Sequence, residues 1–208
     1  KRAELLSHIR NTFHQYNRSL PSETRLSAAE KRRDLARAFD DPAVRMSIEA
    51  DVDLCDHYDV LIKDLERSIL RIARRQDPNT LQLLRTIPGV GKILGLTLLY
   101  EIHTIERFPS VQDFSSYARL VKCASESAGK RYGTSGAKIG NAHLKWAFSE
   151  AAVCFLHRNP RGQAYRNRLR SKHGRGKSMS ILAARLGRAV YFMLRRNKVF
   201  DMDRFLAA

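Results

Sequence analysis

The sequence predicts an all-α protein in which a long coiled-coil helix precedes a compact helical domain. Apolar residues recur at steps of three and four along most of the chain, and no two segments alternate as paired strands do. Glycine and proline separate these periodic segments, as they do at the ends of helices. With 208 residues, 43% of them hydrophobic, the chain is long enough for one substantial core.

The first segment, residues 1–40, is predicted to form two helices. The helix over residues 1–18 has an apolar face that consists of Leu5, Leu6, Ile9 and Phe13. A second, more polar helix is expected from about Ser27 to Phe39, where Ser27 and Glu30 resemble a capping box. Because the chain begins at Lys1 without a methionine, we expect it to be a fragment of a longer protein.

Residues 41–77 predict a coiled-coil arm. Its heptad seam consists of Ile48, Cys55, Tyr58, Ile62, Leu65, Ile69 and Ile72. The seam predicts either a coiled-coil hairpin or dimerising arm, or a helix packed on its own domain, and the spacing does not distinguish them. Four aspartates lie beside it: Asp51, Asp53, Asp56 and Asp59. Because they point in different directions on a helix, they predict a solvated flank or a contact with a partner protomer, and no metal site.

The charge of the chain favours a polyanionic partner. The formal net charge is +17, and residues 120–208 hold 19 Lys or Arg against four acidic residues. Such a field attracts nucleic acid, because neutralised phosphates release their counterions. No run of 18 apolar residues occurs, and Cys55, Cys123 and Cys154 lack disulfide or zinc spacing. We therefore expect a cytoplasmic protein that makes no contact with a membrane.

The stretch Thr86–Lys92, with the sequence TIPGVGK, predicts the turn of a helix-hairpin-helix. Gly89 and Gly91 allow a close approach of the backbone. The amides at the start of the next helix are expected to bind a DNA phosphate, assisted by Lys92. The alternative is a turn that only connects two packed helices.

Residues 123–137 form the longest segment without periodicity and predict an irregular loop of functional importance. Its hydroxyls Ser125, Ser127, Thr134 and Ser135 are candidate nucleophiles. A hydroxyl that attacks a phosphate needs a flexible backbone and cations that offset the developing charge. Glycines supply the first, and the cations are Lys130, Arg131 and Lys138. This chemistry alone does not choose among the hydroxyls.

A run of eight cations without an acidic residue follows: Arg158, Arg161, Arg166, Arg168, Arg170, Lys172, Arg175 and Lys177. A charge run is usually a solvated face, but eight cations exceed what solubility requires, so contact with a nucleic-acid backbone is favoured. We interpret Trp146, Phe148 and Phe155 as core residues, because their neighbours form an apolar helix.

The motifs together resemble a known family over roughly residues 80–195. Thr86–Gly91, Phe108–Leu120, Ser127–Lys130 and Lys138–Lys145 keep the spacing of the C-terminal transposase domain of the insertion-sequence one-ten and eleven-eleven family, a relative of the Piv DNA invertase. The resemblance implies that residues 78–208 are a catalytic-serine domain with a basic C-terminal region. It also implies that Ser127, in Ser-x-Gly-Lys, forms a phosphoserine link to DNA. Asn141 and Lys145 are then expected to contact nucleic acid.

Two residues depart from the family pattern. Ala128 stands where the family commonly has glycine, and Lys145 where it commonly has arginine. These departures leave the serine in place, but the geometry of its loop and its phosphate contacts do not follow from the resemblance.

The same resemblance implies partners and a missing part. Family members are guided by a structured bridge RNA that pairs with target and donor DNA, and we expect a homodimer or tetramer. An upstream RuvC-like domain would bind magnesium through four acidic residues, so this fragment is expected to hold no cofactor and to be inactive alone. We expect part of a DNA transposase or recombinase.

Two alternatives belong to other classes. One is a non-catalytic helix-hairpin-helix module that binds DNA or RNA, which has no use for the Ser127 loop. The other is a ribosome-associated or RNA-chaperone protein, which would explain the basic tail but not the joint spacing of the glycine turn and the serine loop.

Overall fold

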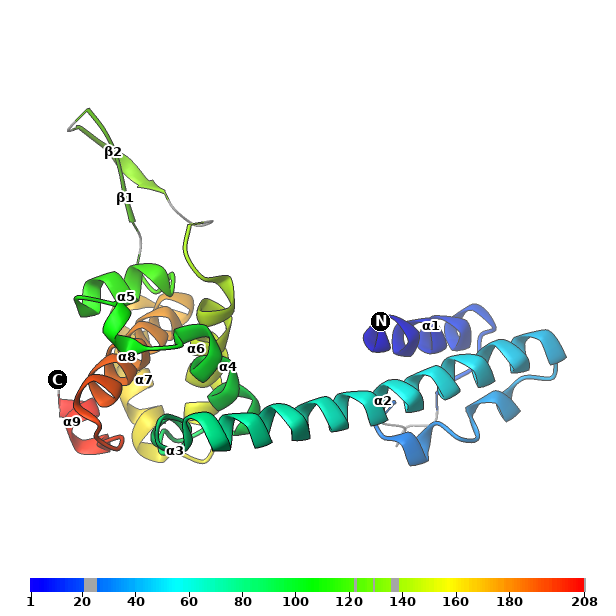
Figure 1. The fold of residues 1–208 in the computed structure, drawn as a ribbon. Coiled ribbons are helices and arrows are strands. Elements are labelled where there is room, and N and C mark those ends of the chain that lie inside the picture. The colour runs from blue at the N-terminus through cyan, green and yellow to red at the C-terminus, as the bar shows by residue number, and fades with distance from the viewer. Residues whose placement is uncertain (21–25, 122, 129, 136–138, 208) are drawn as a thin grey trace. The chain divides into compact units, whose positions relative to one another are not determined.

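The computed structural model describes residues 1–20, 26–121, 123–128, 130–135 and 139–207, and for most of residues 123–135 it describes the backbone alone. Two compact units make up the chain, Lys1–Ile69 and Leu70–Ala208. Almost every element of the described residues is a helix (Figure 1). The predicted all-α class is therefore confirmed, with a short β-hairpin as a local exception.

The first unit builds a small core between α1 (Arg2–Gln15) and the N-terminal part of α2 (Pro42–Gln76). The predicted first helix is confirmed: Ile9 and Phe13 of its apolar face are buried, and the positive φ of Asn17 (49°) follows its end. The core of the unit consists of Ile9, Phe13, Leu26, Leu35, Ala36, Phe39, Val44, Ile48 and Val52.

The segment from Ser27 to Phe39 is not the single α-helix that the sequence predicts. It forms two 3-10 turns, η1 (Ala29–Lys31) and η2 (Leu35–Ala38), and no side chain caps the first of them. The side chain of Arg32 is fully buried and donates a hydrogen bond to the carbonyl oxygen of Leu26 at 2.7 Å. Because short helices are marginal alone, tertiary contacts such as this one decide the local conformation.

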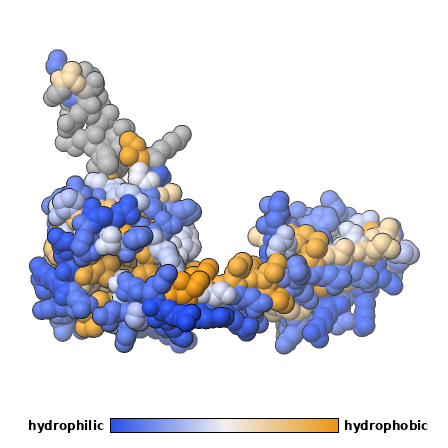
Figure 2. All heavy atoms as spheres, viewed as in Figure 1, coloured by the Kyte–Doolittle hydropathy of each residue, from blue (hydrophilic) through white to orange (hydrophobic). Residues whose placement is uncertain are grey.

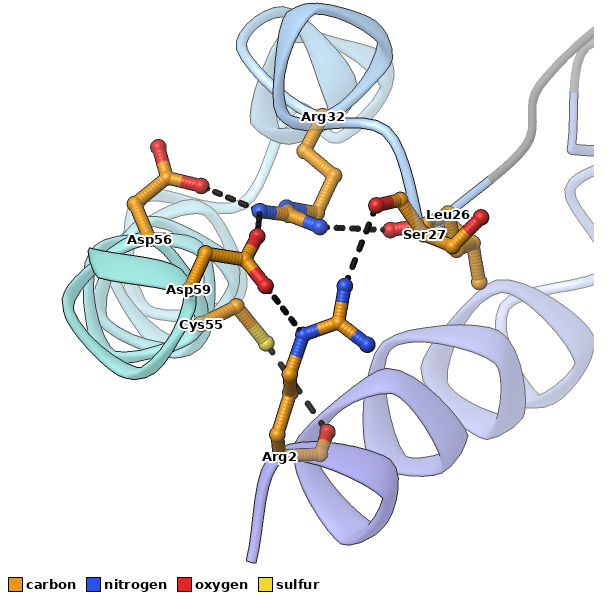
Figure 3. Close-up of polar contacts among 7 residues, drawn as sticks. All are labelled: Arg2, Leu26, Ser27, Arg32, Cys55, Asp56 and Asp59. Carbon is orange, nitrogen blue, oxygen red and sulfur yellow. Dashed lines mark hydrogen bonds and ion pairs between the residues drawn. The ribbon is translucent and has the colours of Figure 1, made fainter. Parts of the chain in front are cut away.

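Arg32 connects this segment to α2 through an ion-pair network (Figure 3). Its guanidinium donates to Asp56 and, at 2.5 Å, to Asp59, which also pairs with Arg2 of α1. Burial alone would raise the pKa of Asp59, but hydrogen bonds from the two arginines outweigh burial and lower it.

Three of the four aspartates beside the seam therefore pair with basic residues inside their own unit, since Asp51 also contacts His8 at 2.5 Å. The predicted solvated flank was wrong for these three. Their partners lie far away in the sequence, so helical spacing could not reveal them. Nowhere in the described part of the chain do three or more His, Cys, Asp or Glu side chains gather so as to hold a metal ion.

Helix α2 is continuous over 35 residues, as the periodicity predicts. The first half of its seam packs within the first unit, where Ile48 and Cys55 are fully buried. The second half is exposed: Ile62, Leu65, Ile69 and Ile72 are 40–62% accessible. Figure 2 shows hydrophobic residues along this part of the helix. The interpretation as a helix packed on its own domain thus holds for the first half alone.

The second unit packs its helices around α8 (Arg175–Arg196), which contacts α3 (Pro78–Arg85), α5 (Val111–Tyr117), α6 (Ala142–Leu156) and α7 (Pro160–His173). Helix α4 (Lys92–Ile102) packs on α3 and α6, η3 (Ile105–Arg107) packs on α8, and α9 (Met202–Ala207) ends the chain. None of the described helices is long and apolar enough to cross a membrane.

Two of the three aromatic residues of α6 that were predicted to lie in the core are buried. Phe148 and Phe155 are buried, as predicted, together with Leu144. Trp146 is 48% exposed, so its prediction as a core residue was wrong. Each residue turns a helix by about 100°, so Trp146 lies nearly opposite the face that Leu144 and Phe148 share.

The predicted irregular loop over residues 123–137 is an antiparallel hairpin of β1 (Cys123–Ser127) and β2 (Lys130–Ser135) (Figure 1). Cys123 pairs with Ser135 and Ser127 with Lys130, and Ala128 takes a positive φ of 51° at the turn. The sequence prediction was wrong here because these strands contain few apolar residues. They therefore lack the period of two by which half-buried strands are found.

Candidate nucleic-acid interface

Helix α7 carries five of the eight cations between residues 158 and 177, Arg158 precedes it, and Arg175 and Lys177 lie in the first turn of α8. Asn159 starts the helix by accepting a hydrogen bond from the Gly162 amide at 3.0 Å, and Pro160 follows at its first position. Gly174, with a φ of 81°, ends α7 and begins α8. No acidic residue interrupts this stretch.

Most of these cations face solvent. Helix α7 turns Gly162 and Tyr165 toward the core, which directs its other faces outward. Seven of the eight are exposed: Arg158, Arg161, Arg168, Arg170, Lys172, Arg175 and Lys177. The guanidinium of Arg168 also lies 5.7 Å from the ring centre of Tyr165. Helix α7 and the residues next to it in the sequence thus present positive charge, and residues 158–177 contain no acidic side chain that offsets it.

Arg161 and Arg166 differ from the other six cations. Arg161 forms an ion pair with Asp203 of α9, so part of its charge is offset. Arg166 is half-buried, and its Nε is buried without a hydrogen-bond acceptor among the described residues. An unsatisfied buried donor costs about 1–3 kcal/mol within the fold.

An open groove of about 970 Å³ lies among the end of α6, helix α7 and the start of α8. Its lining includes the apolar side chains of Val153, Cys154, Leu156 and Met179. Three cations also line it: Arg158, Arg166 and Arg175. The arginines were predicted from the sequence, but the groove was not, because its apolar lining combines residues of two helices that are distant in the sequence.

The two glycines of the turn between α3 and α4 have different environments. Gly89 has a φ of 84°, and a Cβ atom there would lie 2.6 Å from the carbonyl oxygen of Cys154 and from the amide of Phe155. Packing on α6 therefore requires this glycine, in keeping with a turn that connects packed helices. Gly91 directly precedes α4, and in the described part of the chain no atom lies within 4 Å of a Cβ added there. Its role in phosphate binding, with the half-buried Lys92, remains a prediction.

Asn141 has a structural task at the start of α6. Its side-chain oxygen accepts a hydrogen bond from the Leu144 amide at 2.9 Å, and its nitrogen donates to Glu101 at 2.7 Å. A longer contact of 3.4 Å joins it to the hydroxyl of Tyr117, whose pKa is lowered chiefly by that hydrogen bond. Lys145, one turn further, is exposed.

The Ser-x-Gly-Lys motif lies at the tip of the hairpin. Ser127 is the last residue of β1, and its backbone partner Lys130, which is exposed, is the first residue of β2. Arg131 follows on β2, whereas Lys138 lies outside the described residues. The hairpin thus brings Ser127 and Lys130 opposite each other, on either side of the turn.

Residues 81–167 match the Transposase IS116/IS110/IS902 family, a class of transposases of insertion sequences. The matching segment runs from α3 through the hairpin and α6 into α7, and so contains Ser127 and the first three of the eight cations. The resemblance that the motifs indicated is therefore confirmed over this segment.

A protein of Streptomyces coelicolor, the insertion element IS110 uncharacterized 43.6 kDa protein, is 29% identical to this chain over 128 residues. The match covers 60% of this chain and 31% of that relative. The chain therefore spans less than a third of the relative's length in this alignment.

Proposed function

We propose that this chain is the DNA-handling part of a transposase or recombinase that cuts and rejoins DNA through Ser127. The observation that carries the proposal is that the second unit contains both the Ser127 hairpin and a run of eight cations without a carboxylate. The family match supports it, because the matching segment includes the hairpin and reaches into α7.

In this proposal the exposed cations of α7 and of the residues next to it in the sequence hold the DNA backbone. Such contacts position a duplex without reading its sequence, and each neutralised phosphate adds to the salt dependence of binding. Lys145 and the exposed Gly91 at the start of α4 are candidates for further phosphate contacts.

The proposed reaction is a phosphoryl transfer in two steps. The Ser127 hydroxyl oxygen loses its proton and forms a bond to a DNA phosphorus, while the bond from that phosphorus to a sugar oxygen breaks. The sugar oxygen takes up a proton, so that no net proton is gained or lost. Attack by a sugar hydroxyl of the second DNA strand reverses the step, rejoins the DNA and frees the serine. In this proposal Lys130, the backbone partner of Ser127, offsets the charge that develops on the phosphate.

The remaining parts of the proposal concern the partners of this chain. A bridge RNA would select the DNA, and magnesium would be held by acidic residues of an upstream RuvC-like domain. The exposed second half of the α2 seam gives a homodimer or tetramer a place to form, since Ile62, Leu65 and Ile69 repeat at coiled-coil spacing.

The test uses the full-length protein with Ser127→Ala and, as a control, Ser125→Ala on the same strand. We expect Ser127→Ala to abolish both recombination and covalent attachment to labelled DNA, while noncovalent DNA binding persists. Ser125→Ala should keep both activities. Covalent attachment that survives Ser127→Ala would refute the assigned nucleophile. Loss of DNA binding from mutation of the cations, with no covalent product from the wild type, would favour a non-catalytic module.

A further inference from the structure

We propose that the groove among α6, α7 and α8 receives an unpaired nucleobase of the bound nucleic acid, while the phosphates beside that base lie on Arg158 and Arg175. The inference rests on the proposed function and adds to it a preference for nucleic acid with an unpaired nucleotide.

The apolar lining of the groove is unsuited to a phosphate. Val153, Cys154, Leu156 and Met179 offer apolar surface, and Val153 is 56% exposed although it is β-branched and apolar. A regular duplex turns its phosphates and sugars outward and keeps its bases stacked inside. An extruded base instead presents a flat, apolar face, and enzymes that handle such bases hold them in pockets against apolar or aromatic side chains.

The groove also has the charge that such a nucleotide requires. Arg158, Arg166 and Arg175 line it, and no carboxylate lies among the lining residues. Helix α8, 22 residues long, starts at this groove, and no side chain caps its first amides. No atom of the described residues lies within 4 Å of a Cβ added at Gly174 or Gly176, so a phosphate can approach this backbone closely.

Arg166 supplies a donor for the edge of the base. It lines the groove, and the terminal nitrogens of its guanidinium are hydrogen-bond donors, whereas its Nε is buried. Nucleobases carry ring nitrogens and carbonyl oxygens that accept hydrogen bonds from arginine. The volume, about 970 Å³, lies at the upper end of the about 300–1,000 Å³ of ligand pockets, so base and sugar fit together.

The test compares the affinity of the chain for three otherwise identical labelled duplexes. The first is perfectly paired, the second carries one bulged 2-aminopurine nucleotide, and the third carries an abasic bulge, which keeps the flexibility of the bulge but lacks the base. Fluorescence anisotropy at one salt concentration measures the affinities. We expect the base-containing bulge to bind about tenfold more tightly than the other two, with a change in 2-aminopurine emission.

Two matched variants assign this preference to the groove. Val153→Glu should reduce the ratio of the two bulge affinities to about one, whereas Val199→Glu, at a similarly exposed valine outside the groove, should keep it. Because each variant adds one negative charge, the ratio cancels a general loss of DNA affinity. Equal affinity of the wild type for both bulges overturns the inference but leaves the proposed function intact. A chain that binds none of the duplexes overturns the proposed function as well.

Discussion

The two units of this chain use arginine in opposite ways. The first unit, residues 1–69, has 12 Lys or Arg and 13 Asp or Glu, whereas the second has 26 and eight. In the first unit, Arg32 is fully buried and its partners are Asp56, Asp59 and a backbone carbonyl. In the second unit, Arg158 and Arg175 are exposed beside a groove without carboxylates.

The presence or absence of neighbouring carboxylates indicates whether the arginines of a segment have a structural role or a binding role. A buried guanidinium has to be paired, because an uncompensated charge inside a protein is costly. An exposed guanidinium without an acidic neighbour stabilises little within the fold and is available to phosphates. We therefore expect mutations of arginine to affect stability in the first unit and nucleic-acid binding in the second.

The largest expected effect is that of Arg32→Met. The substitution removes a buried cation and leaves Asp56 and Asp59 without it, so we expect a loss of about 3 kcal/mol in the free energy of unfolding of the first unit. Urea unfolding followed by far-UV circular dichroism measures it. The adjacent Arg33→Met is the control, because Arg33 is exposed and should change stability by less than about 0.5 kcal/mol. Equal effects of the two substitutions would contradict the structural role of Arg32.

The next effect separates packing from binding within the second unit. Gly89→Ala places a methyl group against the backbone of α6 at a positive φ, so we expect a loss of about 2 kcal/mol in stability. Gly91→Ala meets no atom within 4 Å among the described residues and should leave stability almost unchanged. The fluorescence of Trp146, the single tryptophan of the chain, reports unfolding of this unit. A stable Gly89→Ala protein would show that the turn does not require glycine for packing.

A smaller effect is expected when acid protonates Asp59. Its folded pKa is lowered, so its contribution to stability is complete above the unfolded pKa of about 3.9 and is lost as the pH falls through the lower folded value. Urea unfolding between pH 6 and pH 3 should show this loss in the wild type. Asp59→Asn should be less stable at pH 6 and show a shallower decline in acid. A decline equally steep in both proteins would assign it to other carboxylates.

The periodicity of apolar residues predicted the helices that pack on a core. Helices α1, α2 and α6 were expected from apolar residues at steps of three and four, and Phe148 and Phe155 are buried as predicted. The hairpin was missed because its strands lack an apolar face. The 3-10 turns were missed because a buried side chain, that of Arg32, shapes them through contacts distant in the sequence.

The sequence predicted the charged residues of the candidate site but not the groove beside them. The cations around α7 were found because a run without carboxylates is visible in one dimension. The groove beside them was not, since Val153 and Met179 meet only when α6 and α8 pack together. The sequence also could not tell that the amide of Asn141 is occupied by Leu144 and Glu101.

The salt dependence of DNA binding tests most directly the claim that the unpaired cations of the second unit hold nucleic acid. The triple variant Arg158→Gln, Arg170→Gln, Arg175→Gln is compared with Arg10→Gln, Arg33→Gln, Arg37→Gln in the first unit, where each arginine is also exposed. Each lost phosphate contact should reduce the slope of log affinity against log salt by about 0.9. We predict a slope shallower by up to about 3 for the first variant and a wild-type slope for the second. Equal slopes for both variants would contradict the account.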